Sequence, residues 1–118
     1  MDRDMEVIKK IILAVKESDK FVTKVEGIPD DLFKFNAALL IESGLVLGKE
    51  MPSSKSNTQI PFTVIVFRLT WDGFEFAELV KDETLWEKAK KHVLKPASGW
   101  TFSVLLEYLK QEAMAKLQ

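Results

Sequence analysis

Hydrophobic positions near the start of the chain recur at steps of one, three and four, the spacing that puts side chains on one helical face. These positions are Val7, Ile8, Ile11, Ile12 and Val15. Charged residues fill most of the remaining circumference, so we predict a helix over about residues 3 to 17 that packs on one side. The following SDKFVTKVEG is expected to be a short extended piece anchored by Phe21 and Val25.

A second helical pattern runs through IPDDLFKFNAALLIES. Asp30 is expected to cap this helix, with Asp31 in its first turn, because side-chain oxygens there accept hydrogen bonds from unpaired backbone N–H groups. Gly44 is expected to end it, since glycine tolerates the left-handed conformation found after many helices. The predicted apolar face consists of Leu32, Phe33, Ala37, Leu40 and Ile41.

The pattern then changes to that of a β-hairpin. Residues 45 to 47 form a short β-branched and aliphatic run, and IPFTVIVFRL has the composition of a well-buried strand. Between them, Gly48 to Gln59 are rich in serine, lysine, asparagine and proline, which favours an exposed loop. Two strands around a polar loop predict a hairpin, which we call the wing.

Helical patterns return after the wing. Thr70 is placed to cap a helix whose apolar members are Trp71, Phe74, Phe76, Leu79 and Val80. A break is expected near Asp82, followed by a helix through ETLWEKAKKHVLK that packs with Leu85, Trp86, Ala89 and Val93. KPASG is expected to form a turn. A last helix from about Thr101 carries a stripe of Phe102, Leu105, Leu106, Leu109 and Ala113.

The order of these elements predicts an α+β fold: a winged helix-turn-helix-like core with a β-hairpin wing and additional C-terminal helices. The usual middle helix has little room between Ser18 and Pro29, so a turn or a strand is expected there. At 118 residues with 47% apolar composition, we predict one domain over residues 1–118, with the core at about 3–80 and a helical extension at about 81–118.

Four segments carry a resemblance to a known family. They are ESGLV at 42–46, RLTWDGFEF at 68–76, the opening RDMEVIKKIILAV and the later DETLWEKAKK. RLTWDGFEF resembles the leucine-threonine-x-x-glycine step that leaves the wing in many winged-helix regulators. Together, over nearly the whole chain, the segments resemble a bacterial and phage family of small uncharacterised proteins, a domain of unknown function. The resemblance implies the winged-helix-like fold and a bacterial or prophage source, and it implies no activity.

Charge and composition narrow the function classes. The 17 basic and 18 acidic side chains give a formal net charge of -1, so any attraction to nucleic acid would have to be local. The chain has no cysteine, which excludes disulfides and cysteine-ligated metal sites and fits a reducing compartment. No signal peptide and no membrane-spanning segment is expected, so we predict a cytoplasmic protein.

Candidate catalytic groups are scarce. His92 is the one histidine, and a single imidazole in a polar segment is more typical of a solvent-facing helix residue than of a triad or a metal site. Carboxylate pairs such as Asp30 with Asp31, or Asp82 with Glu83, fall where helix starts attract negative charge. The five glycines are scattered, so no phosphate-binding loop is predicted. We therefore expect no enzyme, cofactor or metal.

Nucleic-acid binding is the first functional hypothesis, because a winged helix presents its third helix to the major groove and its wing to phosphates. Candidate contacts are Lys34, Asn36, Lys49, Lys55 and Asn57. On the predicted recognition helix, Asp30 and Asp31 weaken this hypothesis, since affinity for DNA depends on lysine and arginine releasing counterions. Arg68 could also contact phosphate, although an internal ion pair is the favoured interpretation.

A non-enzymatic protein-interaction module is the second hypothesis. The acidic helix and the C-terminal helices would then serve as docking surfaces, and a homodimer could form through the last helix. The three tryptophans, Trp71, Trp86 and Trp100, are expected in the core rather than stacking on bases. The basic residues Lys88, Lys90, Lys91 and Lys95 are expected to form a solvated face, with an acidic partner as the alternative.

Overall fold

The first two helices form where the hydrophobic pattern predicts them. In the computed structural model, which describes residues 1–55, 57–95 and 101–117, α1 spans Met5–Glu17 and α2 spans Asp30–Ser43. The α1 helix begins after Asp4, whose carboxylate accepts hydrogen bonds from two N–H groups of the first turn. The α2 helix ends at Gly44, which has a left-handed φ of 81° as expected.

The predicted cap of α2 is wrong. Pro29, not Asp30, occupies the N-cap position, and no side chain there accepts a hydrogen bond from the helix. The proline suits this place because its fixed φ leads into a helix and it has no N–H group that needs a partner. Asp30 and Asp31 lie in the first turn, where their negative charge still interacts favourably with the helix dipole.

Residues 18–29, all of which the structure describes, contain no helix. Instead, Val22 pairs with Val66 through two backbone hydrogen bonds of 2.8 and 2.9 Å, and a turn follows at Gly27 with φ 86°. Val22 is buried, whereas Phe21 is 66% exposed. The expectation that Phe21 anchors this segment is therefore wrong, because the backbone pairing of Val22 decides which side chains face the core.

The wing is a two-stranded antiparallel hairpin, as predicted. Its strands are β1, Val46–Met51, and β2, Thr63–Leu69. The register runs from Val46 opposite Leu69 to Met51 opposite Thr63, with an irregularity beside Leu47 that leaves one extra residue, Phe67, on β2. The β1 strand continues into the segment that the composition had assigned to the loop.

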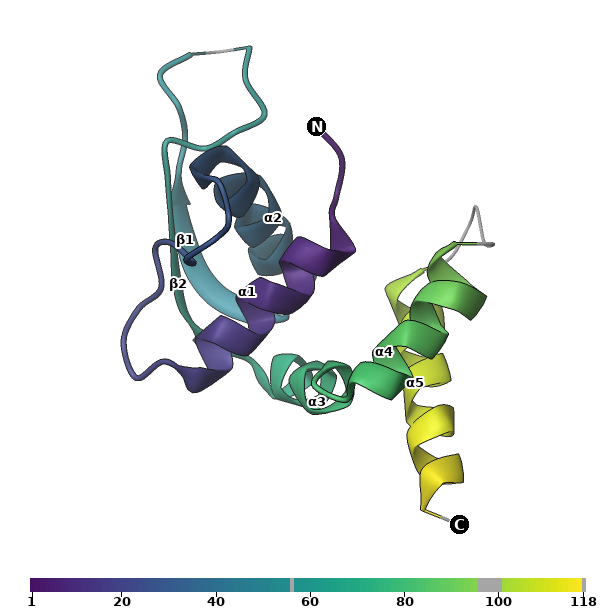
Figure 1. Ribbon diagram of the computed structural model, residues 1–118. Helices are drawn as coiled ribbons and strands as arrows, with labels where there is room; N and C mark the ends of the chain where they lie inside the picture. Colours follow the sequence, from purple (N-terminus) through teal and green to yellow (C-terminus); the bar gives the residue numbers. More distant parts are fainter. Residues whose placement is uncertain (56, 96–100, 118) are drawn as a thin grey trace. The chain divides into compact units, whose positions relative to one another are not determined.

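Helices α1 and α2 pack against one face of the hairpin (Figure 1). The side chains that fill this core are fully or almost fully buried, among them Ile11, Ile12, Phe33, Leu40, Val64, Val66 and Leu69. The expectation of a well-buried strand over IPFTVIVFRL holds for Val64, Val66 and Leu69, but Phe67 on β2 and Phe62 just before it are 38% and 65% exposed. Within the first unit, the described helices α1 and α2 cover one face of the hairpin.

After the hairpin, α3 spans Trp71–Val80. Its start is capped as predicted, since Thr70 Oγ1 accepts a 3.1 Å hydrogen bond from the N–H of Gly73. The Thr70 N–H also donates to the carbonyl oxygen of Leu45 at 3.0 Å. The exit from the hairpin is thereby joined to the corner between α2 and β1.

The remaining helices are α4, Glu83–Ala89, its continuation η1, Lys90–Leu94, and α5, Phe102–Lys116. The predicted break holds, because Asp82 caps α4 by accepting from the N–H of Leu85 at 3.1 Å. The η1 segment is a π-helical turn closed by the Lys95 N–H and the Lys90 carbonyl oxygen, a feature that the hydrophobic pattern does not reveal. The predicted KPASG turn lies outside the described residues apart from Lys95.

Helices α4 and α5 pack together, and the predicted apolar stripes meet there. Fully or nearly fully buried members are Leu85, Trp86, Ala89, Val93, Leu105 and Leu109. Phe76 of α3 and Phe102 of α5 add an edge-to-face ring pair with centroids 5.1 Å apart. The structure divides into two compact units, Met1–Phe74 and Glu75–Gln118, whereas the sequence placed the start of the helical extension near residue 81. No helix among the described residues has the length and apolar character to cross a bilayer.

Candidate interaction surface

The face of the hairpin that α1 and α2 leave uncovered is largely apolar. Gly48 faces α2, because a Cβ atom at this position would meet the Ile41 side chain at 3.0 Å. Alternation along the strands therefore places the neighbouring side chains on the other face. They are Leu47, Lys49, Met51, Thr63, Ile65 and Phe67.

Three of these apolar side chains are substantially exposed: Leu47 at 44%, Met51 at 49% and Phe67 at 38%. An antiparallel sheet with one face in water normally alternates apolar residues on the core face with polar residues on the other. This hairpin departs from that pattern, since most side chains on the uncovered face are aliphatic or aromatic, and the charged residues there are Lys49 and Arg68, the register partner of Leu47.

Phe21 extends this apolar face. Its ring lies 4.7 Å from the ring of Phe67, centroid to centroid, at an angle of 40°. The neighbouring Val22 holds it there through the backbone bridge to Val66. We define the outer hairpin surface as Phe21, Leu47, Lys49, Met51, Ile65 and Phe67.

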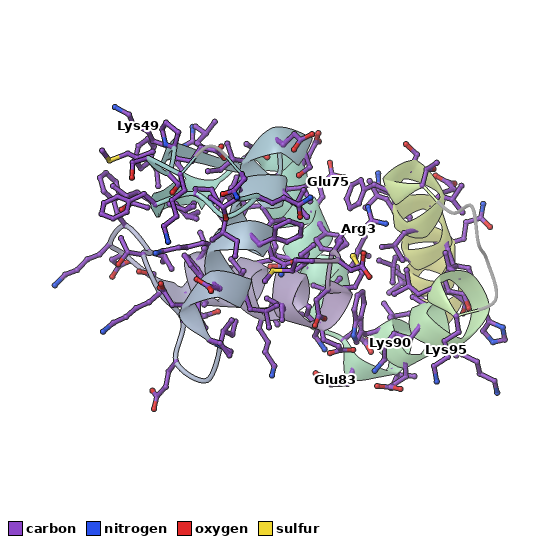
Figure 2. All side chains as sticks on the ribbon, turned by 90° about the horizontal axis from the view of Figure 1, so that it is seen from above. Arg3, Lys49, Glu75, Glu83, Lys90 and Lys95 are labelled. Atoms are coloured by element: carbon purple, nitrogen blue, oxygen red, sulfur yellow. The ribbon has the colours of Figure 1, made fainter. Side chains whose placement is uncertain are left out.

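Three of the five residues predicted to contact DNA lie together on the wing. Lys49, Lys55 and Asn57 are all exposed, and Figure 2 shows Lys49 extending away from the hairpin. The loop near Lys55 is shaped by a hydrogen bond of 3.2 Å from its N–H to Ser53 Oγ. These side chains are available to a phosphate or to an acidic partner.

Asn36 is fully buried, so the expectation that α2 exposes it is wrong. Its Oδ1 accepts from the N–H of Asp4 at 3.0 Å, and its Nδ2 donates to the Leu32 carbonyl oxygen at 2.9 Å. Both bonds satisfy backbone or side-chain groups that burial would otherwise leave unpaired. Asn36 thus joins α2 to the start of α1 and does not face solvent.

Lys34 is the other residue of α2 predicted to contact DNA, and it is engaged within the chain. Its Nζ lies 2.8 Å from Asp30 Oδ2, one helical turn away, and 5.9 Å from the centroid of the Phe62 ring. Asp30 and Asp31 are exposed in the first turn. Among the side chains that α2 presents, this acidic first turn opposes the approach of phosphates.

The structure also tests the predictions made for Arg68 and for the tryptophans. Arg68 Nη1 donates to the Leu69 carbonyl oxygen at 2.8 Å, and the favoured ion pair of Arg68 with a carboxylate is not formed among the described residues. Trp86 is buried as predicted, but the core position expected for Trp71 is wrong, because Trp71 is 81% exposed. The Thr70 cap points the first residue of α3 outward, and Trp100 lies outside the described residues.

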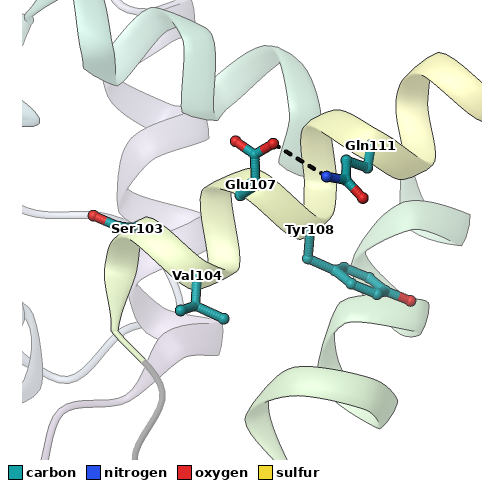
Figure 3. Close-up of a pocket in the computed structure, with 5 residues that line it drawn as sticks. All are labelled: Ser103, Val104, Glu107, Tyr108 and Gln111. Carbon is teal, nitrogen blue, oxygen red and sulfur yellow. Dashed lines mark hydrogen bonds between the residues drawn. The ribbon is translucent and has the colours of Figure 1, made fainter.

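An open hollow of about 450 Å³ lies along α5 (Figure 3). Its lining residues are Ser103, Val104, Glu107, Tyr108 and Gln111. Gln111 Nε2 donates to Glu107 Oε1 at 3.2 Å, and burial, with a smaller contribution from Glu112, raises the pKa of the Tyr108 phenol. The phenol of Tyr108, the amide of Gln111 and the carboxylate of Glu107 can form hydrogen bonds with a molecule in this hollow.

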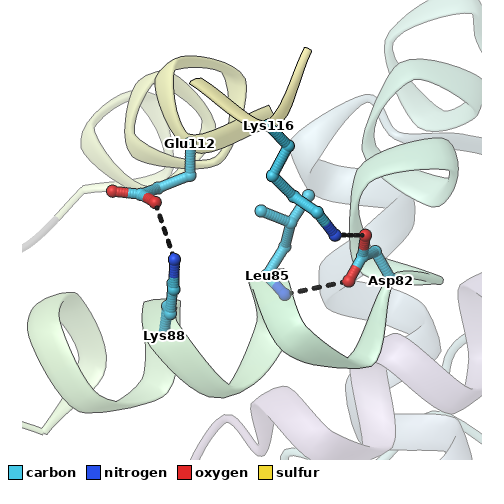
Figure 4. A network of polar contacts seen from close by, with 5 residues as sticks. All are labelled: Asp82, Leu85, Lys88, Glu112 and Lys116. Carbon is cyan, nitrogen blue, oxygen red and sulfur yellow. Dashed lines mark hydrogen bonds and ion pairs between the residues drawn. The ribbon is translucent and has the colours of Figure 1, made fainter. Parts of the chain in front are cut away.

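Carboxylates in the second unit serve the packing of its helices (Figure 4). Asp82 Oδ2 lies 2.6 Å from Lys116 Nζ on α5, and Lys88 Nζ lies 3.3 Å from Glu112 Oε2. The hydrogen bond from Lys116, followed by that from the Leu85 N–H, lowers the pKa of Asp82. These pairs join α4 to α5. The Asp82 carboxylate therefore has a structural role, because it caps α4 and pairs with Lys116.

His92 is exposed, as predicted, with its ring 6.2 Å from that of Tyr108. In residues 1–55, 57–95 and 101–117, no three histidine, cysteine or acidic side chains gather as metal ligands. The feature that the sequence interpretation missed is the outer hairpin surface. Its signal was present in VIVF at 64–67, where four consecutive positions are apolar.

The family model described as Hypothetical protein (DUF2513) matches residues 2–99. No curated protein matches the chain. No solved structure matches it. The match covers more than half of the chain and confirms the predicted domain-of-unknown-function family, so this protein belongs to the DUF2513 family of hypothetical proteins.

Proposed function

We propose that this protein is a non-enzymatic interaction module that binds a protein partner through the outer hairpin surface. The observation that carries the proposal is the set of half-exposed apolar side chains on the uncovered face, with Phe21 against Phe67. Exposed apolar and aromatic residues gathered on one face are typical of protein-binding sites. Lys49 lies among them, so the partner is expected to combine apolar side chains with a carboxylate.

The proposed architecture is a winged helix with a reduced middle helix. Support comes from the order of α1, the Val22 bridge, α2 and the hairpin, in which the bridge takes the place of a third strand beside β2. From the family resemblance we propose a bacterial or prophage source. We also propose a cytoplasmic location. A homodimer through α5 is a further proposal, and sedimentation equilibrium of the full chain would test it.

Peptide display on the immobilised full chain tests the partner proposal. We expect the wild-type protein to select peptides that contain apolar or aromatic residues and at least one acidic residue. The same peptides should not bind a Phe21→Ser, Phe67→Ser double variant. Because both positions are exposed, this variant is expected to fold, and circular dichroism checks that it does.

A charge reversal at Lys49 sharpens this test. Selection on Lys49→Glu should yield peptides with lysine or arginine in place of the acidic residue, because complementary charge determines partner choice. Lys20→Glu, at an exposed position outside the defined surface, is the matched control and should leave the selected peptides unchanged. Peptides that bind the double phenylalanine variant as well as the wild type would contradict the proposal.

Nucleic-acid binding by the wing is the second candidate function, and the exposure of Lys49, Lys55 and Asn57 favours it. In contrast, the buried Asn36 and the acidic start of α2 oppose base readout by that helix. If the wing contacts phosphates, a Lys49→Ala, Lys55→Ala variant should bind duplex DNA more weakly, and its salt slope should fall by about two. Unchanged binding of this variant would exclude the wing as the contact.

A further inference from the structure

A cluster of cationic side chains surrounds an open hollow in the second unit. The hollow has a volume of about 490 Å³ and lies along α4 and η1. Its lining residues are Glu87, Lys88, Lys90, Lys91, His92 and Lys95. This site shares no residue with the outer hairpin surface or with the wing.

The acidic groups near this hollow are already engaged with two of its lysines. Glu87 Oε1 lies 3.0 Å from Lys90 Nζ, and Glu112 Oε2 lies 3.3 Å from Lys88 Nζ. Lys91 and Lys95 are exposed, and no carboxylate of the described residues forms an ion pair with either. Positive charge therefore remains uncompensated along one side of the hollow.

The helix dipole does not compensate the positive charge of Lys91 and Lys95. The carbonyl groups at a helical C-terminus carry about half of one negative charge, which is less than the two unpaired lysines contribute. The π-helical turn at Lys90–Leu94 also places these residues differently from a regular helix, and such turns occur frequently at functional sites. A ligand with several negative charges would compensate the remainder.

We infer that this hollow binds the phosphate backbone of nucleic acid. Lys91 and Lys95 both line the hollow, and each offers an exposed ammonium group to a bound anion. A nucleic-acid strand carries one negative charge on each phosphate, so neighbouring phosphates can compensate more than one lysine. Lysine binds a phosphate as a flexible point charge, which suits a contact that does not read sequence.

The experiment uses the full chain and a fluorescently labelled duplex of random sequence, with binding followed by anisotropy across a salt series. A Lys91→Glu, Lys95→Glu variant should bind at least about tenfold more weakly at low salt, and its salt slope should be smaller by roughly two. A Lys10→Glu, Lys20→Glu variant is the control, because it changes the net charge equally at exposed positions of the first unit. It should bind nearly as well as the wild type.

Three outcomes would overturn the inference. The wild type could fail to bind at low salt, the two variants could lose binding equally, or polyglutamate of matched charge could compete as well as the duplex. The last result would assign the hollow to an acidic protein segment. Two double variants separate this site from the proposed function. One replaces Phe21 and Phe67 with serine, and the other replaces Lys49 and Lys55 with alanine. Both should retain DNA binding through the hollow.

Discussion

Thr70 Oγ1 donates a 2.7 Å hydrogen bond to the carbonyl oxygen of Gly44. Thr70 Oγ1 also accepts a hydrogen bond from the N–H of Gly73 at 3.1 Å. One side chain therefore caps α3 and provides a hydrogen bond to a carbonyl group at the end of α2. Residues 26 positions apart are thereby joined. The leucine-threonine-x-x-glycine step of the sequence has a structural role at this junction.

Replacement of Thr70 by valine should destabilise the first unit. The variant keeps the shape of the side chain but loses both hydrogen bonds of the hydroxyl, so the free energy of unfolding should fall by about 1–2 kcal/mol. Urea denaturation followed by circular dichroism measures this change. Thr70→Ser retains the hydroxyl and should lose much less, and equal losses in the two variants would argue against the role of these bonds.

Alanine at Gly73 should also destabilise the protein, although alanine favours helices by about 1 kcal/mol over glycine. A Cβ atom at this position would lie 2.0 Å from the carbonyl oxygen of Leu45, so the backbone of α3 or of the corner would have to move. We expect a net loss of about 1–3 kcal/mol in the free energy of unfolding. Asp72→Ala, at the exposed neighbouring position, is the control, and a gain in stability in Gly73→Ala would show that this close approach is absent.

Asn36 is expected to affect folding and not ligand binding. Asn36→Ala leaves the Asp4 N–H and the Leu32 carbonyl oxygen without their side-chain partner, which should lower the free energy of unfolding by about 1–3 kcal/mol. Asn57→Ala, on the exposed loop, should change it by less than about 0.5 kcal/mol. If Asn36→Ala were as stable as the wild type but bound DNA more weakly, the original assignment of Asn36 to a recognition helix would be restored.

Asp82 makes the second unit sensitive to acid. Its pKa is lower in the folded chain than in the unfolded chain, first because of the hydrogen bond from Lys116, so its contribution to stability is complete above the unfolded value of about 4. That contribution is lost as the pH falls from this value through the folded pKa. Thermal melts between pH 6 and pH 2, as an approximate range, should show a smaller acid-induced fall in Tm for Asp82→Asn. Asp72→Asn is the control and should follow the wild type.

Tyr108 is the one tyrosine of the chain, so its ionisation can be followed by absorbance at a wavelength specific to tyrosinate. Burial, and then the negative charge of Glu112, raises the pKa of Tyr108 above its usual value of about 10. Glu112→Gln should lower the titration midpoint toward that value. The unfolded chain ionises first as the pH rises, so stability should decrease above about pH 10. A midpoint at or below this value in the folded wild type would contradict the burial of the Tyr108 phenol.

Local patterns were enough to predict most of the secondary structure. The spacing of Ile8, Ile11 and Ile12 predicted α1, Gly44 predicted the end of α2, and Thr70 predicted the start of α3. These features depend on neighbours within a few residues, through helical periodicity, left-handed backbone tolerance and capping. The serine- and lysine-rich segment likewise predicted the position of the hairpin.

The identity of exposed and buried residues depended on contacts between distant segments. The bridge between Val22 and Val66 leaves the neighbouring Phe21 exposed and in contact with Phe67. The hydrogen bond from the Asp4 N–H provides a partner for Asn36 in the core. In this hairpin the apolar residues of β2 do not indicate which face is covered, because consecutive positions from Val64 to Phe67 are all apolar. Only the packing of α1 and α2 on a single face of the hairpin decides that Leu47, Met51 and Phe67 remain accessible.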